Sequence, residues 1–266
     1  MRFARSGSGP PLLLLHGIGH RWQAWEPVID RVGAHHDVIA VDLPGFARSP
    51  LPPGGVLTAM PSLVAAVSAF LTDEGIERPH VAGNSLGGAI ALELAAADHA
   101  ASVTALSPAG FATRRQRRRA RAILGTLRAS AFLPASVLGA AMRSGAVRAL
   151  AFGPLVARPG RLSPERTLAD ALALRRAPGF RDASQMLQDY RCVTDPAVPV
   201  TIAWGDRDRI LRPLQAATAR ARLPRARHVE LPGCGHVPMS DDPDLVASVI
   251  LETTGATGAA SSPPEA

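Results

Sequence analysis

The stretch HVAGNSLGGAIALEL, residues 80–94, joins an apolar run typical of a buried strand to a segment with the pattern of a helix. A single serine, Ser85, stands at the junction, with glycines two positions before it and two positions after it. A chain that reverses this sharply strains the backbone of its central residue and leaves no room for neighbouring Cβ atoms. The pattern therefore predicts a turn that lifts the Ser85 hydroxyl clear of a sheet, at the N-terminal end of a helix.

Strand-like apolar runs and helical patterns alternate on both sides of this stretch. Alternation of this kind is typical of an α/β fold, in which a mostly parallel central sheet carries helices on both faces. The predicted strands are residues 12–15, 38–41, 80–83, 103–106, 200–204 and 228–231. The predicted helices of the core are residues 62–71, 86–97, 214–221 and 245–251.

The alternation stops between residues 111 and 195, where no strand-like run of similar quality occurs. An amphipathic helical pattern opens this segment, and five prolines divide the remainder into short helices. We therefore predict an α/β core made of residues 1–110 and 196–252, with a helical insertion at 111–195. The low-complexity end, residues 253–266, is predicted to be a disordered tail.

The positive charge of the chain is concentrated in the insertion. All 29 basic residues are arginines, and residues 111–195 hold 16 of them against five acids. We interpret the arginines that open the insertion as a solvated helix face. The alternatives are attraction of an anionic substrate, a membrane surface or an acidic carrier protein. Nucleic acid is not expected as a partner, because aromatic residues make up only 4% of the chain and none interleaves with these arginines.

Cysteine usage and hydropathy indicate the setting of the protein. Cys192 and Cys234 lie far apart and fit no metal-ligand spacing, so we expect no disulfide, no metal and no cofactor. The leucine run at residues 12–15 is too short for a signal sequence or a membrane span. We therefore expect a cytoplasmic protein without stable membrane insertion, whose oligomeric state the sequence does not indicate.

A reactive serine needs a base, and the base needs a group that orients it. His236 lies in a glycine-rich loop after the last predicted strand, which places nucleophile, acid and histidine in the chain order that this architecture requires. The turn after strand 200–204 offers two carboxylates, Asp206 and Asp208. We predict that Asp208 orients the histidine, because a residue three positions into the turn can point back over the strand end, while Asp206 caps the turn or pairs with an arginine.

Two more segments, LLLLHGIGHRWQAWEPVI and VIAVDLPGFARS, resemble the His-Gly oxyanion loop and the D-x-P-G-x-G-x-S segment of the α/β-hydrolase family. With the three regions above, the resemblance runs from about residue 10 to about residue 251. It implies an oxyanion hole formed by the backbone N–H groups of Ile18 and Leu86, and a helical cap at the insertion. The sequence departs from the pattern at Ala47, where a glycine is common. The short N-terminus further suggests that the first edge strands are missing or abbreviated.

Serine rather than aspartate at the turn argues against epoxide opening and dehalogenation. The resemblance implies a serine hydrolase of the esterase or lipase type (class EC 3.1), which acts on a small-molecule carboxylic ester or related acyl substrate through an acyl-enzyme. The alternatives are a carbon–carbon bond hydrolase, an acyltransferase or perhydrolase, and a noncatalytic ligand receptor on the same fold. The apolar residues of the cap indicate a pocket for a largely apolar group. Its candidate lining residues are Trp25, Phe111, Phe132 and Met186.

Overall fold

The computed structural model describes residues 1–51 and 59–255. Its central sheet has the strand order β1-β3-β2-β4-β5-β6-β7, and only β1 runs antiparallel to its neighbour. This mostly parallel sheet confirms the predicted α/β class. The strands are β1 (Arg2–Gly7), β2 (Pro11–Leu15), β3 (Asp37–Asp42), β4 (His80–Asn84), β5 (Ser102–Leu106), β6 (Val200–Gly205) and β7 (Arg227–Leu231).

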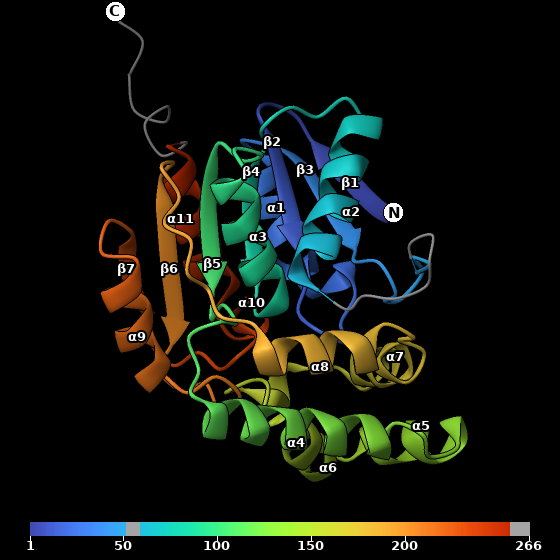
Figure 1. Ribbon diagram of the computed structural model, residues 1–266. Helices are drawn as coiled ribbons and strands as arrows, with labels where there is room; N and C mark the ends of the chain where they lie inside the picture. Colours follow the sequence, from blue (N-terminus) through green and yellow to red (C-terminus); the bar gives the residue numbers. More distant parts are fainter. Residues whose placement is uncertain (52–58, 256–266) are drawn as a thin grey trace, which may run out of the picture.

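Helices cover both faces of the sheet (Figure 1). On one face lie α2 (Met60–Asp73), α3 (Leu86–Ala96) and α9 (Leu214–Arg222), and on the other lie α1 (Glu26–Gly33) and α11 (Pro243–Thr254). In β2, Leu13 and Leu15 belong to the first core and Leu12 and Leu14 to the second, all with 0% exposure. Burial on both faces therefore explains why β2 is apolar without alternation.

One antiparallel edge strand, β1, precedes β2 and is not among the strands predicted from the sequence. β1 pairs with β3 along its whole length, yet most of its residues are exposed. It therefore lacks the apolar run by which the buried strands were predicted. The sequence analysis also missed α1, whose apolar positions are separated by proline and charged residues.

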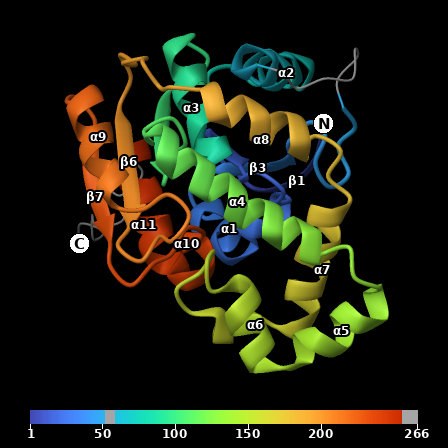
Figure 2. The same ribbon diagram turned by 60° about the horizontal axis from the view of Figure 1, so that its bottom comes forward.

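A layer of helices lies across the carboxyl ends of the parallel strands (Figures 1 and 2). It comprises α4 (Arg114–Ser130), α5 (Ala135–Arg143), α6 (Gly145–Phe152), α7 (Pro164–Arg175) and α8 (Phe180–Asp189), all between β5 and β6. Prolines separate them as predicted: Pro134 directly precedes α5, and Pro164 is the first residue of α7. The shorter elements of the chain are η1 (Trp22–Trp25), η2 (Pro159–Arg161) and α10 (Pro238–Asp241).

Across the described residues, no single helix is both long enough and apolar enough for a membrane span. Helices α4 and α5 reach the required length and composition only together, and the pair is bent by 109°.

The predicted tail begins two residues too early. Thr253 and Thr254 still belong to α11, which ends at Gly255 in a left-handed conformation. The Thr253 hydroxyl joins this last turn to the sheet, because it contacts the hydroxyl of Thr201 in β6 at 2.8 Å. The rest of the predicted tail, residues 256–266, lies outside the described residues.

The turn between β4 and α3 has the strained geometry predicted from its glycines. Ser85 has φ 56° and ψ −110°, in a region that residues with a side chain rarely adopt. A Cβ atom on Gly83 would lie 2.2 Å from the carbonyl oxygen of Gly87, and one on Gly87 would lie 2.2 Å from the carbonyl oxygen of Leu15. Both glycines are therefore required by the close approach of β2, β4 and α3.

Replacing Gly87 by alanine should destabilise the fold. In Gly87→Ala the new methyl group meets the β2 backbone, which cannot move without breaking sheet pairing, so we expect a loss of about 3 kcal/mol in the free energy of unfolding. Gly125→Ala is the control, because nothing lies within 4 Å of its added Cβ in the helix α4. It should stabilise the protein by about 0.5 to 1 kcal/mol. Urea unfolding measures both changes, and equal stabilities would contradict the argument.

Candidate active site

Ser85 lies at the carboxyl end of β4 and immediately before the first residue of α3. Its backbone N–H donates to the carbonyl of Leu106 at the end of β5, with an N···O distance of 2.9 Å. The N–H of Leu86 is the first of α3, so no carbonyl one turn earlier in the helix can accept it. Ser85 therefore stands where the partial positive charge of a helix N-terminus faces the open end of the sheet.

The structure brings His236 and Asp208 together beneath the helical layer. Nδ1 of His236 lies 2.8 Å from Oδ2 of Asp208, and both residues are buried. The second carboxylate oxygen, Oδ1, accepts hydrogen bonds from the backbone N–H groups of Ile210 and Leu211, at 2.8 and 2.9 Å. With Nδ1 donating its proton to the carboxylate, the lone pair of His236 is on Nε2.

The second candidate carboxylate, Asp206, has a different position. It is exposed, and its Oδ1 accepts a hydrogen bond from the backbone N–H of Gly233, at 2.7 Å. This bond joins the turn after β6 to the loop that carries His236. Asp206 thus holds a turn, as expected for the residue that does not contact the histidine.

Two buried polar residues that the sequence analysis missed fix the loop around His236. The Asn84 side chain donates to the carbonyl oxygen of His236 at 2.8 Å. The carboxylate of Asp241 accepts backbone N–H bonds from Gly235, Ala157 and Arg158, at 2.7 to 2.9 Å. Asn84 could have been suspected from its place beside the serine. Asp241 gave no signal, because its donors Ala157 and Arg158 come from a distant segment of the chain.

The loop after β2 lies against the serine turn. A Cβ atom on Gly17 would be 3.3 Å from the Cβ of Ser85, so this close approach is best met by glycine. His16 is fully buried: its Nε2 accepts the backbone N–H of Leu43 at 2.9 Å, and its Nδ1 contacts the carbonyl of Gly17 at 2.7 Å. Both contacts fit a neutral ring, and burial lowers the pKa of His16 to about 3.

Two cavities meet at the candidate nucleophile. Ser85 and Ile18 lie on the walls of both. The first, which we call the His236 cavity, is lined mostly by apolar side chains and extends under the helical layer; its wall includes His236, His20, Asp170, Leu127, Leu138, Met142, Phe152 and Leu174. The second, which we call the Arg117 cavity, extends along α4; its wall includes Ala109, Arg117, Arg121, Leu187, Gln188 and Leu211.

A model of the alpha/beta hydrolase family matches residues 12–249. The chain belongs to this family. The pimeloyl-(acyl-carrier protein) methyl ester esterase of Aeromonas hydrophila is 28% identical over 94% of this chain and 98% of its own length. An uncharacterized protein of Mycobacterium tuberculosis is 31% identical over 95% of this chain and 78% of its own length. A solved structure of a thermophilic esterase from Thermogutta terrifontis has a TM-score of 0.74 at 23% identity, over 96% of this chain and 93% of that one, which is a likeness of fold.

In the structure of this alpha/beta hydrolase, none of the four candidate pocket residues lies on the wall of either cavity. The prediction that they line the pocket is therefore wrong. Trp25 is fully buried in the core beside α1 and α11, and Phe111 packs edge-on against Trp204. Met186 faces the core, whereas Phe132 is 59% exposed under the guanidinium of Arg128. The direction of an aromatic or sulfur side chain depends on helix packing, which the residue type alone does not determine.

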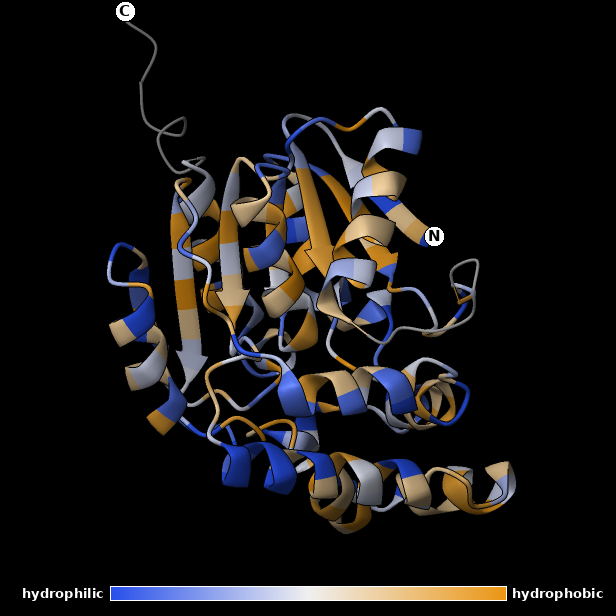
Figure 3. Cartoon of the chain, viewed as in Figure 1, coloured by the Kyte–Doolittle hydropathy of each residue, from blue (hydrophilic) through white to orange (hydrophobic). Residues whose placement is uncertain are grey.

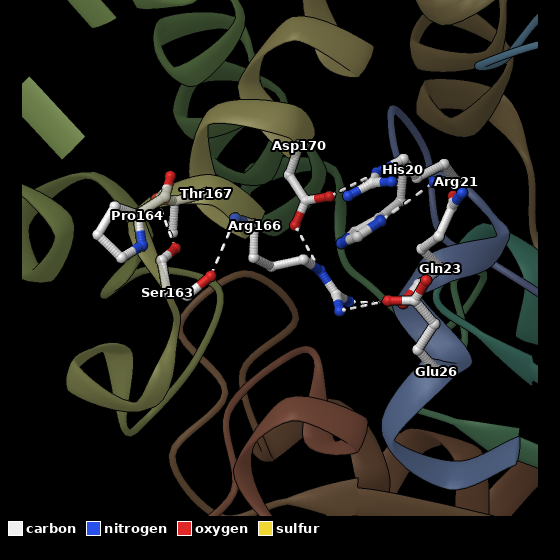
Figure 4. A network of polar contacts seen from close by, with 9 residues as sticks. All are labelled: His20, Arg21, Gln23, Glu26, Ser163, Pro164, Arg166, Thr167 and Asp170. Carbon is white, nitrogen blue, oxygen red and sulfur yellow. Dashed lines mark hydrogen bonds and ion pairs between the residues drawn. The ribbon is translucent and has the colours of Figure 1, made fainter. Parts of the chain in front are cut away.

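A polar network joins α7 to the loop after β2 (Figure 4). Asp170 lies between Arg21, at 2.8 Å, and Arg166, at 3.2 Å, and Arg166 also contacts Glu26 at 3.2 Å. Two cations and two carboxylates therefore balance in a partly buried cluster. His20 belongs to the same network, since its Nδ1 accepts the N–H of Arg21, and burial lowers its pKa. The network fixes the helical layer relative to the loop that carries Ile18.

The described part of the chain contains no group of three or more histidine, cysteine, aspartate or glutamate side chains that could hold a metal ion. Cys192 and Cys234 are both buried free thiols. Burial raises the pKa of Cys234 to about 12, so this thiol stays protonated beside the histidine loop.

The buried His16 should make stability depend on pH. Its pKa is about 3 in the folded chain and about 6.5 when unfolded, so the unfolded chain binds more protons between these values. Its contribution is complete above about pH 6.5 and is lost as the pH falls, by up to about 1.4 kcal/mol per pH unit. His16→Gln keeps a distal acceptor for Leu43 without a titrating ring. Urea unfolding from about pH 7 to about pH 4.5 should show that the free energy of unfolding changes less steeply with pH in the variant than in the wild type. Equal slopes would show that His16 does not cause the pH dependence.

Proposed function

We propose that this alpha/beta hydrolase is a serine hydrolase that cleaves a carboxylic ester or related acyl substrate, with Ser85 as nucleophile, His236 as base and Asp208 as the orienting acid. The observation that carries the proposal is the 2.8 Å contact between His236 Nδ1 and Asp208 Oδ2, with His236 and Ser85 on the wall of one cavity. A nucleophile, a base and a third group that orients the base are the parts that acyl transfer requires.

In the proposed reaction, His236 Nε2 takes the proton of the Ser85 hydroxyl while Oγ attacks the carbonyl carbon. The oxyanion that forms accepts hydrogen bonds from the N–H groups of Ile18 and Leu86, at the N-terminus of α3. The bond to the leaving oxygen or sulfur then breaks, and His236 returns its proton to the leaving group. Water, activated by the same histidine, releases the acid from the acyl-enzyme.

The surroundings of Ser85 support a small, largely apolar substrate. Leu127, Leu138 and Phe152 come from three different helices of the layer and reach the wall of the His236 cavity. We propose that α4 to α8 form a cap that excludes water from the reacting atoms, which strengthens the hydrogen bonds to the oxyanion. Apolar area buried in this cavity would contribute about 25 cal/mol per Å² to binding.

The relatives support ester hydrolysis as the reaction type. The protein of Aeromonas hydrophila and the fold neighbour from Thermogutta terrifontis are both described as esterases. A serine nucleophile accords with this reaction, because its acyl-enzyme is released by attack of water on the same carbonyl carbon.

Ser85→Ala should abolish turnover and leave the fold intact. Hydrolysis of p-nitrophenyl esters should fall on the order of 10⁴-fold, and labelling by a fluorophosphonate probe should disappear, because the attacking oxygen is absent. A chain that takes no label and cleaves no ester, thioester or lactone would instead be a receptor. Products formed in the presence of an added alcohol separate a hydrolase from an acyltransferase.

The two carboxylates of the turn after β6 provide a matched pair of variants. Asp208→Asn keeps the shape but removes the charge that stabilises the His236 imidazolium and its tautomer, so kcat should fall by roughly 10³ to 10⁴ with little change in KM. Asp206→Asn should remain within about tenfold of the wild type, because Asp206 is exposed and an amide oxygen can still accept the hydrogen bond from the Gly233 N–H. The reverse order of the two kcat values would make Asp206 the orienting acid.

A further inference from the structure

Helices α4 and α8 pack side by side in the helical layer (Figure 2). Residues of both helices line a groove. The first turns of α4 are strongly hydrophilic (Figure 3). We call this feature the basic groove, because its wall carries five arginines and one acid: Arg114, Arg117, Arg118, Arg121, Arg191 and Asp189.

The arginines of the basic groove are not neutralised by the protein. Among the described residues, none of the five forms an ion pair with a carboxylate, whereas the arginines of the polar network in Figure 4 do. Their hydrogen bonds go to neutral oxygens instead: Arg121 donates to the Gln185 side chain at 2.9 Å, and Arg191 donates to nearby carbonyls. Guanidinium groups gathered in this way attract an anion such as a carboxylate or a phosphate.

Arg117 is the buried arginine of the basic groove. Its side chain is 6% exposed, and one terminal nitrogen donates to the carbonyl of Ala112. Its Nε is buried and has no hydrogen-bond acceptor anywhere in the part of the chain that the structure describes. A buried guanidinium with an unused donor is unfavourable unless an acceptor completes it.

The basic groove adjoins the site. Arg117, Arg121 and Gln188 lie on the wall of the groove and also on the wall of the Arg117 cavity, whose other end is Ser85. Leu124 lies on the walls of both cavities at Ser85, and Arg117 is seven residues earlier in α4, about 10 Å along the helix. A chain of medium length that starts at Ser85 would therefore bring its far end to the guanidinium groups.

The position of His236 decides which part of the substrate points toward the groove. His236 must give its proton to the leaving group, and it lies on the wall of the His236 cavity but not on that of the Arg117 cavity. The leaving group therefore departs into the His236 cavity. The Arg117 cavity is left for the acyl chain, which remains bound to Ser85 in the acyl-enzyme.

We propose that the preferred substrates carry an anionic group, a carboxylate or a phosphate, at the far end of the acyl chain, and that the basic groove binds this group. The proposal rests on the function proposed above and defines its substrate class. The ester bond breaks between the carbonyl carbon and the leaving oxygen, the leaving group takes the proton of His236, and the anionic end is unchanged by the reaction.

The test compares p-nitrophenyl esters that differ only at the far end of the acyl chain: octanoate, the monoester of suberate, and ω-phosphooctanoate. At low salt, kcat/KM should be at least about tenfold higher for an anionic ester than for octanoate, because the anionic end forms charge-assisted hydrogen bonds with the guanidinium groups and the methyl end of octanoate forms none. Whichever anionic ester gains more identifies the group that the groove binds. The monoesters of succinate, adipate and sebacate should reveal one optimal length, since the groove lies at a fixed distance from Ser85.

Two variants on the wall of the basic groove and one control locate the effect. Arg121→Gln should lower the anionic-to-neutral ratio of kcat/KM about tenfold, and Arg117→Gln should do the same if its unfolding curve matches the wild type. Arg115→Gln is the control, because Arg115 is exposed on the same helix and is not on the wall of the groove. The proposal would be overturned if the wild type had an anionic-to-neutral ratio of kcat/KM near one at every chain length. It would also be overturned if Arg115→Gln lowered this ratio as much as Arg121→Gln does.

Failure of the proposed function would give a different result. If the wild type cleaves none of these esters, the hydrolase assignment fails, and calorimetric titration of the protein with suberate, ω-phosphooctanoate and octanoate then tests the groove alone. Binding of an anionic probe that Arg121→Gln weakens and Arg115→Gln does not would retain the anion site without the reaction. Equal binding of the three probes would rule out the anion site as well as the hydrolase function.

Discussion

The close contact between the backbones of β2, β4 and α3 is the constraint on which the site depends. At Gly83 and Gly87 the chains approach so closely that a single Cβ atom would displace a carbonyl oxygen. This contact holds Ser85 in a left-handed conformation and points the first N–H of α3 toward the open end of the sheet. The strain at Ser85 persists because the sheet and the helix on either side are fully packed.

Around that point, side-chain carboxylates and amides use backbone N–H and C=O groups to fix loops that have no regular structure. Asp208 receives two backbone N–H groups while it contacts His236, and Asp241 receives three from two separate segments. Asn84 donates to the carbonyl of His236. Because buried polar groups of a loop must find partners, these three side chains determine both the path of the loop and the orientation of the imidazole.

The helical layer combines two kinds of electrostatic environment. Where α7 meets the core, Arg21, Arg166, Asp170 and Glu26 form a balanced and partly buried cluster, which holds the layer in place. Along the basic groove, exposed arginines and the buried Arg117 have no carboxylate ion-pair partner among the described residues. The first arrangement is complete within the protein, whereas the second has an excess of positive charge available to a ligand.

The sequence by itself determined the α/β class, the six parallel strands, the helical segment between β5 and β6, and the turn at Ser85. These features depend on local patterns: continuous apolar runs, prolines between helices, and glycines where backbones touch. The exposed strand β1 had no such pattern. Asp241 and the two cavities could not be predicted, because Asp241 binds backbone groups more than eighty residues away. Only the tertiary structure decided which side chains line the site, since the direction of Trp25, Phe111, Phe132 and Met186 is set by helix packing and by the neighbours that helix packing provides.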